Sequence, residues 1–274
     1  MPDIVLDKQG NEQLFNEVAT SYDRSGPKFF TEWGKRLIEL MPITPGLRVL
    51  DIAAGTGAVL FPAAQKVGPK GRVTGIDLSG EMVQEARRIA RSSGLSNVDF
   101  LKMDAEHLEF PDASFDTVTC GFGIFFCPDM NAAFREMYRV CKPGGYIGLT
   151  VFDKNPAPFT PGFPILNQQV TAYKVPYVRM SHGSSWTPEE MKGMIEQFGF
   201  RSTLTRSEFY DLVYSNAEEW WKCMLATGPR ATIMLMDEET RARFKEEYCA
   251  KLQSMMKPDG LHIAVGAVYA IAQK

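Results

Sequence analysis

The stretch VLDIAAGTG at residues 49–57 decides the fold. Apolar residues and one aspartate form a run of strand length, and this run ends directly in a turn of small residues. Gly55 and Gly57 permit positive φ angles and a close approach of the backbone to a ligand, and Ala53 is nearly as small. Such a turn between a strand and a helix presents backbone N–H groups and a helix N-terminus to a ligand.

Short β-rich runs alternate with helical periods from Leu47 to Asp153. The first helix of clear amphipathic period is SGEMVQEARRIARSSG, and Ser79 is placed to cap it. The runs that predict strands are LRVLDIA, RVTGIDL, NVDFLKM, SFDTVTCGFG and YIGLTVF. Alternation of this kind predicts an α/β fold, a parallel sheet with helices on both faces.

The segments that flank this core differ from it in composition. We expect residues 1–45 to form an aromatic, helical N-terminal cap, and residues 154–186 to form a lid rich in proline, aromatic residues and methionine without sustained periodicity. Residues 187–274 are expected to complete the core around a helical insertion at about 212–258. A long irregular segment inside a compact domain is typically functional, so we expect the lid to cover a substrate site.

An acidic residue stands where a nucleoside ligand requires one. Asp77 ends the second predicted strand, 20 residues after Gly57. At this distance an acid hydrogen-bonds the ribose hydroxyls of an adenosine ligand. Gly57 is followed by Ala58, Val59 and Leu60, so the third glycine that a dinucleotide pyrophosphate requires is missing. The ligand is therefore predicted to be an adenosine without a diphosphate, which argues against a nicotinamide oxidoreductase.

Taken together, these motifs resemble the class I S-adenosylmethionine-dependent methyltransferases, and within them the small-molecule branch that includes the ubiquinone and menaquinone biosynthesis enzymes. The resemblance covers residues 47–153, through LDIAAGTG, GIDLS, MDAEHLEFPDASFD and CKPGGYIGLTVF, and extends weakly to FNEVATSYD. It implies a Rossmann-like, doubly wound sheet of seven strands whose last strand is antiparallel. It also implies S-adenosyl-L-methionine as methyl donor and S-adenosyl-L-homocysteine as product. Ala53 stands where many relatives carry a glycine.

The resemblance assigns cofactor contacts residue by residue. Asp77 would meet the ribose, Met82 would cover the adenine, and Asp104 with Ala105 would meet the polar edge of the base. Gly121, at the end of the fourth strand, would lie beside the methionine moiety, and Tyr22 would close over the cofactor. The full predicted set is Tyr22, Asp51, Ala53, Gly55, Gly57, Asp77, Leu78, Met82, Asp104, Ala105 and Gly121.

The acceptor is predicted to be a hydrophobic or aromatic small molecule, methylated on carbon or oxygen as in quinone or natural-product biosynthesis. The lid is aromatic and carries few charges, which favours an apolar ligand. His182, in the lid, is the candidate general base. The side chains predicted to wall the substrate pocket are Phe122, Phe125, Phe126, Tyr177 and Trp186.

Two further readings stay open within this fold. One is a cofactor-binding protein that catalyses a non-methylating rearrangement, and the other is an N-methyltransferase acting on a small amine. Methylation of RNA or protein is disfavoured, because the net charge is −3 and no basic stripe is present. CGFGIFF after the fourth strand likewise lacks the motif of amino-nitrogen methylation of a base.

Composition sets the remaining expectations. The five cysteines have no C-x-x-C spacing, so we expect neither a metal site nor a disulfide framework. No stretch approaches the unbroken apolar length of a transmembrane helix, and MPDIVLDKQG lacks the apolar core of a signal peptide. We therefore expect a cytoplasmic protein. The sequence leaves the oligomeric state open, a homodimer included.

Overall fold

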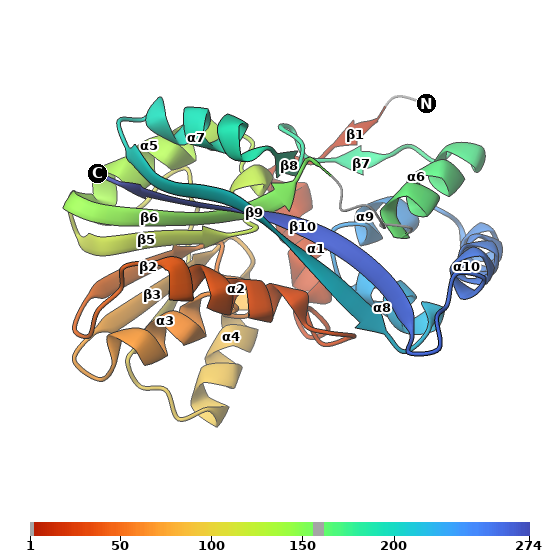
Figure 1. The fold of residues 1–274 in the computed structure, drawn as a ribbon, viewed down its shortest axis with the longest axis horizontal. Coiled ribbons are helices and arrows are strands. Elements are labelled where there is room, and N and C mark those ends of the chain that lie inside the picture. Colours follow the sequence, from red (N-terminus) through yellow and green to blue (C-terminus); the bar gives the residue numbers. More distant parts are fainter. Residues whose placement is uncertain (1–2, 156–161) are drawn as a thin grey trace.

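One large sheet forms the centre of the molecule in the computed structural model, which describes residues 3–155 and 162–274 (Figure 1). Its main strands follow the order β4-β3-β2-β5-β6-β10-β9. Their bounds are β2 Arg48–Ile52, β3 Arg72–Asp77, β4 Val98–Lys102, β5 Phe115–Gly121, β6 Cys141–Asp153, β9 Arg201–Tyr214 and β10 Leu261–Gln273.

The direction of the strands confirms the predicted topology. Neighbours among β2 to β6 pair in parallel, whereas β10 runs antiparallel to both β6 and β9. The seven-stranded sheet with an antiparallel last strand is therefore confirmed. The short strand β8, Ser185–Trp186, adds a further member beside the end of β6.

Helices cover both faces of the sheet, as the alternating pattern predicts. In Figure 1, α2, α3 and α4 lie on one face and α5 and α7 on the other. The bounds are α2 Phe29–Leu40, α3 Leu60–Val67, α4 Gly80–Ser92, α5 Met130–Val140 and α7 Pro188–Glu196, with a short 3-10 helix at Ile124–Phe126. The order of the strands reverses between β2 and β5. In doubly wound sheets, ligands bind at the carboxyl ends of the strands at such a reversal.

Side-chain caps explain where the core helices begin. The Ser79 hydroxyl accepts a hydrogen bond from the Met82 amide at 3.1 Å and so starts α4, as predicted. Thr187 and Glu190 form a reciprocal capping box at the start of α7. These caps fix the helix N-termini beside the strand ends, where the crevice lies.

The remaining elements form a cap around the carboxyl ends of the strands. They are β1 Ile4–Val5, α1 Lys8–Val18, α6 Gly162–Ala172, β7 Val178–Arg179, α8 Ala217–Leu225, α9 Arg230–Ile233 and α10 Glu238–Gln253. The segment 154–186, expected to lack periodicity, contains the helix α6 in its described part. β1 pairs in parallel with β7, so the N-terminal cap and the lid share a two-stranded sheet.

The cap has an aromatic core of its own. The Trp220 indole nitrogen donates to the Tyr248 hydroxyl at 2.7 Å, and this hydroxyl donates to the Gly162 carbonyl at 2.9 Å. β6 pairs with β10 only as far as Ala267, so the first part of β10 and its partner β9 continue into the cap. Among the described helices, none is both long and apolar enough to cross a lipid bilayer.

Candidate functional site

The main cleft lies at the carboxyl ends of β2 to β5, where the strand order reverses. It encloses about 730 Å³ of empty space, its open mouth included. Most of the cofactor contacts predicted from the sequence come together here. The predicted residues that line the cleft are Tyr22, Ala53, Gly55, Asp77, Leu78, Met82, Asp104, Ala105 and Gly121.

Asp77 connects two of the elements that form the cleft. Its Oδ2 accepts from the Gly55 backbone N–H at 2.8 Å, and its Oδ1 accepts from the Ser79 N–H at 2.9 Å. Burial raises the pKa of this carboxyl to about 6, although the backbone N–H groups around it favour the charged form. Each carboxylate oxygen retains a second lone pair for a ligand hydroxyl.

The two glycines of the turn have different surroundings. Gly55, at φ +52°, has open space where a Cβ would lie and lines the cleft. A Cβ on Gly57, at φ +99°, would stand 2.4 Å from the Phe61 ring, so this glycine permits packing against α3. The described structure places Gly57 outside the lining of the main cleft, although the sequence predicts a cofactor contact there.

Asp51 lies beneath the turn rather than along the cleft. Its side chain is buried, and its Oδ1 accepts from the Thr119 hydroxyl at 2.8 Å. Burial raises the pKa of this carboxyl to about 7, and the nearby Asp77 carboxylate adds to the shift. Two acids with raised pKa values, Asp51 and Asp77, therefore lie close together where the strand order of the sheet reverses.

Helix α1 closes one side of the main cleft, a role that the sequence did not predict for its individual residues. Lys8, Asn11, Glu12 and Phe15 all line the cleft. The Lys8 ammonium lies 2.7 Å from an Asp104 oxygen and 2.6 Å from a Glu106 oxygen. These contacts join residues about a hundred positions apart, so only the folded chain reveals them.

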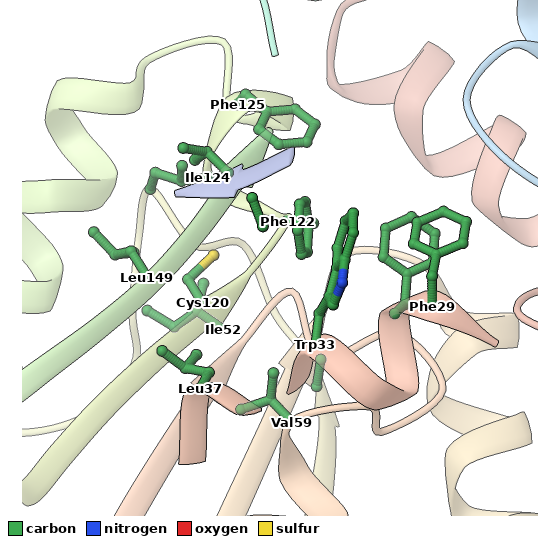
Figure 2. Close-up of a cluster of buried hydrophobic side chains, with 14 of the residues drawn as sticks. Phe29, Trp33, Leu37, Ile52, Val59, Cys120, Phe122, Ile124, Phe125 and Leu149 are labelled. Carbon is green, nitrogen blue, oxygen red and sulfur yellow. The ribbon is translucent and has the colours of Figure 1, made fainter. Parts of the chain in front are cut away.

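Aromatic rings form the wall at the end of β5. Phe122 lines the cleft in a left-handed backbone conformation, φ +52°, which is strained for a residue with a side chain. Its N–H donates to the Thr150 carbonyl at 2.9 Å. Its ring stacks on the Trp33 indole with centroids 4.8 Å apart (Figure 2). Packing and hydrogen bonding thus hold Phe122 in this conformation.

A smaller side pocket continues from the main cleft between the glycine turn and α2. It shares Gly55 and Phe122 with the main cleft and adds Phe30, Gly34 and Thr150. A Cβ on Gly34 would lie 2.3 Å from the Ala58 carbonyl oxygen, so α2 touches the backbone of the turn directly. The shape of this pocket therefore depends on the seating of α2.

The predicted substrate-wall residues are divided. Phe122 and Phe126 line the main cleft. Phe125 is buried in the adjoining aromatic cluster, part of which Figure 2 shows. The centroid of its ring lies 6.1 Å from that of Trp186. The Tyr177 carbonyl accepts from the Ile4 amide at 2.9 Å, which ties that residue to β1. The described structure places Phe125, Tyr177 and Trp186 outside the lining of the cleft.

His182 lies at the rim of the site. Its side chain is exposed, and its Nε2 lies 3.0 Å from the carbonyl oxygen of Pro128, a residue that lines the cleft. A carbonyl oxygen only accepts, so Nε2 carries the hydrogen. This contact ties His182 to the Pro128 loop, and His182 is not among the described residues that line the cleft.

Cys127 provides the remaining titratable group at the β5 end of the cleft. Burial raises the pKa of its thiol to about 12, so this group stays protonated at neutral pH. The other lining residues from 121 to 128 are Gly121, Phe122, Gly123, Phe126 and Pro128, and none of them ionises. This wall is therefore uncharged.

These features fit the cofactor expected from the sequence. A carboxylate with free lone pairs, an open glycine turn and an uncharged aromatic wall occupy successive positions along one cleft. Apolar side chains of Leu78, Met82 and Ala105 flank the β3–β4 end, which suits the faces of a flat base. An adenine nucleoside with an extended substituent matches this order of groups.

Comparison with known proteins agrees with this geometry. The model of the ubiE/COQ5 methyltransferase family matches residues 4–205. Aklanonic acid methyltransferase DauC of Streptomyces sp. (strain C5) is 39% identical over 202 residues, which cover 73% of this chain and 86% of that relative. Demethylmenaquinone methyltransferase of Listeria welshimeri is 40% identical over 139 residues, which cover 49% of this chain and 59% of that relative.

A solved structure extends the comparison to the whole fold. The [4+2]-cyclase SpnF superposes with a TM-score of 0.61 and 20% sequence identity, covering 100% of this chain and 99% of that protein. Identity at this level establishes a shared fold and does not carry an activity from one protein to the other.

Proposed function

Because the chain belongs to the ubiE/COQ5 methyltransferase family and is an S-adenosylmethionine-dependent methyltransferase, we propose that it methylates a carbon or oxygen atom of a hydrophobic aromatic small molecule. The acceptor belongs to the quinone or polyketide type of natural product. The relatives support this class, since one is named for aklanonic acid and another for demethylmenaquinone.

The observation that carries the proposal is the uncharged wall at the β5 end of the cleft. Phe126 lines the cleft there beside Phe122, whose ring is largely buried, and the protonated Cys127 thiol offers no base. Such a wall binds an apolar ring and does not compensate a charged amine. The acceptor therefore contributes its own acidity, as a phenol or an enolisable ketone does.

The bound cofactor supplies a methyl group already activated on a sulfonium sulfur. We propose that the Asp77 carboxylate accepts hydrogen bonds from the ribose hydroxyls while the open backbone at Gly55 lets the ligand approach. Phe122, held by Thr150 and Trp33, then forms a rigid surface against which the acceptor lies. Orientation of two reactants in this way lowers a barrier by as much as about 7–11 kcal/mol.

Nucleic acid is not the proposed acceptor. The chain has a net charge of −3 and a pI of about 5.8, which gives it no excess of cations to neutralise a phosphate backbone. We propose a small molecule as the acceptor. The oligomeric state is a separate question, and the molar mass measured by light scattering distinguishes a homodimer from a monomer.

A product assay tests the proposed function. Purified protein is incubated with S-adenosylmethionine and either phenols, enolisable polyketide-like ketones or small primary amines, and mass spectrometry detects S-adenosylhomocysteine and each product. Equal amounts of S-adenosylhomocysteine and methylated aromatic product support the proposal. Transfer restricted to the amines contradicts it. An isomerised acceptor without S-adenosylhomocysteine would instead indicate a rearrangement on the same fold.

A further inference from the structure

Asn11 presents a buried hydrogen-bond acceptor that no protein group satisfies. The residue lines the main cleft from helix α1, and its exposed fraction is 4%. Its Nδ2 donates to the Phe126 carbonyl oxygen at 2.9 Å. A carbonyl oxygen only accepts, so this contact fixes the orientation of the carboxamide. Its Oδ1 therefore has no hydrogen-bond partner within the described chain.

An unsatisfied buried oxygen of this kind requires an explanation. Buried polar atoms in native proteins are nearly always paired, so an orphan on a residue that lines a cleft is available to a group that binds there. The position of Asn11 is well defined, because Lys8, one turn earlier on the same face of α1, is ion-paired with Asp104 and Glu106. The hydrogen bond to Phe126 thus fixes the Asn11 carboxamide directly, and the Lys8 ion pairs fix the turn of α1 that carries it.

The layout of the cleft limits which ligand group reaches Asn11. With the ribose at Asp77 on β3, the base extends toward the end of β4, away from the glycine turn. The loop that follows Phe126 also borders this end of the cleft, because the Asp129 N–H donates to the Glu106 carboxylate at 2.9 Å. The Lys8–Asp104 pair brings the first turn of α1 to this β4 end. Asn11 therefore belongs to the part of the cleft that takes the base.

The chemistry of the free atom then identifies the contact. Asn11 Oδ1 accepts hydrogen bonds and cannot donate them. The donors of the cofactor are the ribose hydroxyls, which we assign to Asp77, the ammonium of the distant methionine end, and the exocyclic amino group of adenine. We propose that Asn11 Oδ1 accepts a hydrogen bond from this amino group, in addition to the contact that the sequence assigns to Asp104, and so selects adenine over a base with a carbonyl at that position. This inference rests on the proposed function.

The test compares two ligands that differ at this one group. S-adenosylhomocysteine and its deaminated analogue S-inosylhomocysteine are titrated by calorimetry into the wild type, Asn11→Ala and Gln13→Ala. Gln13 is the matched control, because it is an exposed amide on the same helix. We expect Asn11→Ala to bind S-adenosylhomocysteine about tenfold more weakly, with affinity for the deaminated ligand changed less than about twofold. Gln13→Ala keeps both wild-type affinities.

The ratio of the two affinities separates recognition from a structural role. If Asn11→Ala weakens both ligands equally, the residue only seats α1 and the inference is wrong; an unchanged affinity for both also overturns it. Asn11→Leu keeps the volume without polar atoms, and it is measured in the same way should Asn11→Ala fail to show a cooperative thermal transition. Failure of the wild type to bind either ligand would contradict the proposed function instead.

Discussion

The backbone N–H of Gly55 donates to Oδ2 of Asp77 at 2.8 Å, so one carboxylate both fixes the glycine turn and faces the cleft. The other oxygen of Asp77 holds the Ser79 N–H at the start of α4. The geometry of the turn and the affinity for a nucleoside therefore depend on the same side chain.

Replacement of Asp77 by alanine is expected to weaken S-adenosylhomocysteine binding by about 10- to 100-fold, because hydrogen bonds to a charged group are lost on both the ligand and the turn. Calorimetric titration measures the effect. Asp112→Ala is the control, since the Asp112 side chain is 79% exposed and pairs with Arg139 away from the cleft. Equal affinities of Asp77→Ala and the wild type would refute the adenosine assignment.

The raised pKa values of Asp51 and Asp77 predict a pH dependence of stability. Burial raises the pKa of Asp77 to about 6 and that of Asp51 to about 7 from an ordinary value of 3.8. The folded state therefore binds these protons more tightly than the unfolded state, and the free energy of unfolding falls as pH rises from about 4 to 7. Urea denaturation of the ligand-free protein at pH 5.5 and pH 8 measures this fall.

The variant Asp51→Asn isolates one of these contributions, because an amide does not titrate. We expect the difference in unfolding free energy between pH 5.5 and pH 8 to be smaller in Asp51→Asn than in the wild type. An identical pH dependence in both proteins would show that the buried carboxyl at this position does not contribute.

Two glycine-to-alanine changes are expected to have opposite effects. A Cβ on Gly34 would lie 2.3 Å from the Ala58 carbonyl oxygen, so Gly34→Ala forces α2 away from the turn. Overpacking of this kind costs about 1–3 kcal/mol and is expected to weaken S-adenosylhomocysteine binding as well. Gly193, inside α7, has open space at that position, and Gly193→Ala is expected to stabilise by about 0.5–1 kcal/mol. Thermal melts that rank the two variants the other way would contradict the packing described here.

The variant His182→Ala distinguishes two roles for this residue: the general base predicted from the sequence, and the positioning of the Pro128 loop through the contact seen in the structure. Loss of a general base lowers a rate by about 10²- to 10⁴-fold. Since His182 is exposed and bonded to the Pro128 carbonyl, we expect kcat to fall less than about tenfold, with the pH profile unchanged. A hundredfold fall accompanied by loss of an ionisation near neutral pH would restore the base assignment.

The core strands and the helices between them were predictable because short-range signals determine them, whereas the antiparallel last strand followed from the family resemblance. A single sequence is enough to recognise the apolar runs of strand length, the Ser79 cap and the small residues from Ala53 to Gly57. Asp77 was also identifiable, since its distance from the turn is set by the length of one strand–helix–strand unit.

The cap was less predictable because tertiary contacts organise it. The helix α6 lies in a proline-rich region without a clear amphipathic period, so the sequence gives no strong signal for it. Asn11 and Lys8 reach the cleft only because α1 docks against residues about a hundred positions away. Tyr177 and Trp186 have the composition of a substrate wall, but the described structure directs them to β1 and to the aromatic core.

The pairing of β1 with β7 has a practical consequence for protein engineering. The backbone ladder at Ile4–Val178 joins the segment that carries α1 to the lid, and Glu17 adds an ion pair to Arg230 of the insertion. A transplant of the lid alone from a relative would replace one strand of this pairing, and with it one of the contacts that hold the segment of α1 in place. Chimeras designed to accept new substrates should therefore exchange the first eighteen residues and the lid together, as a single cassette.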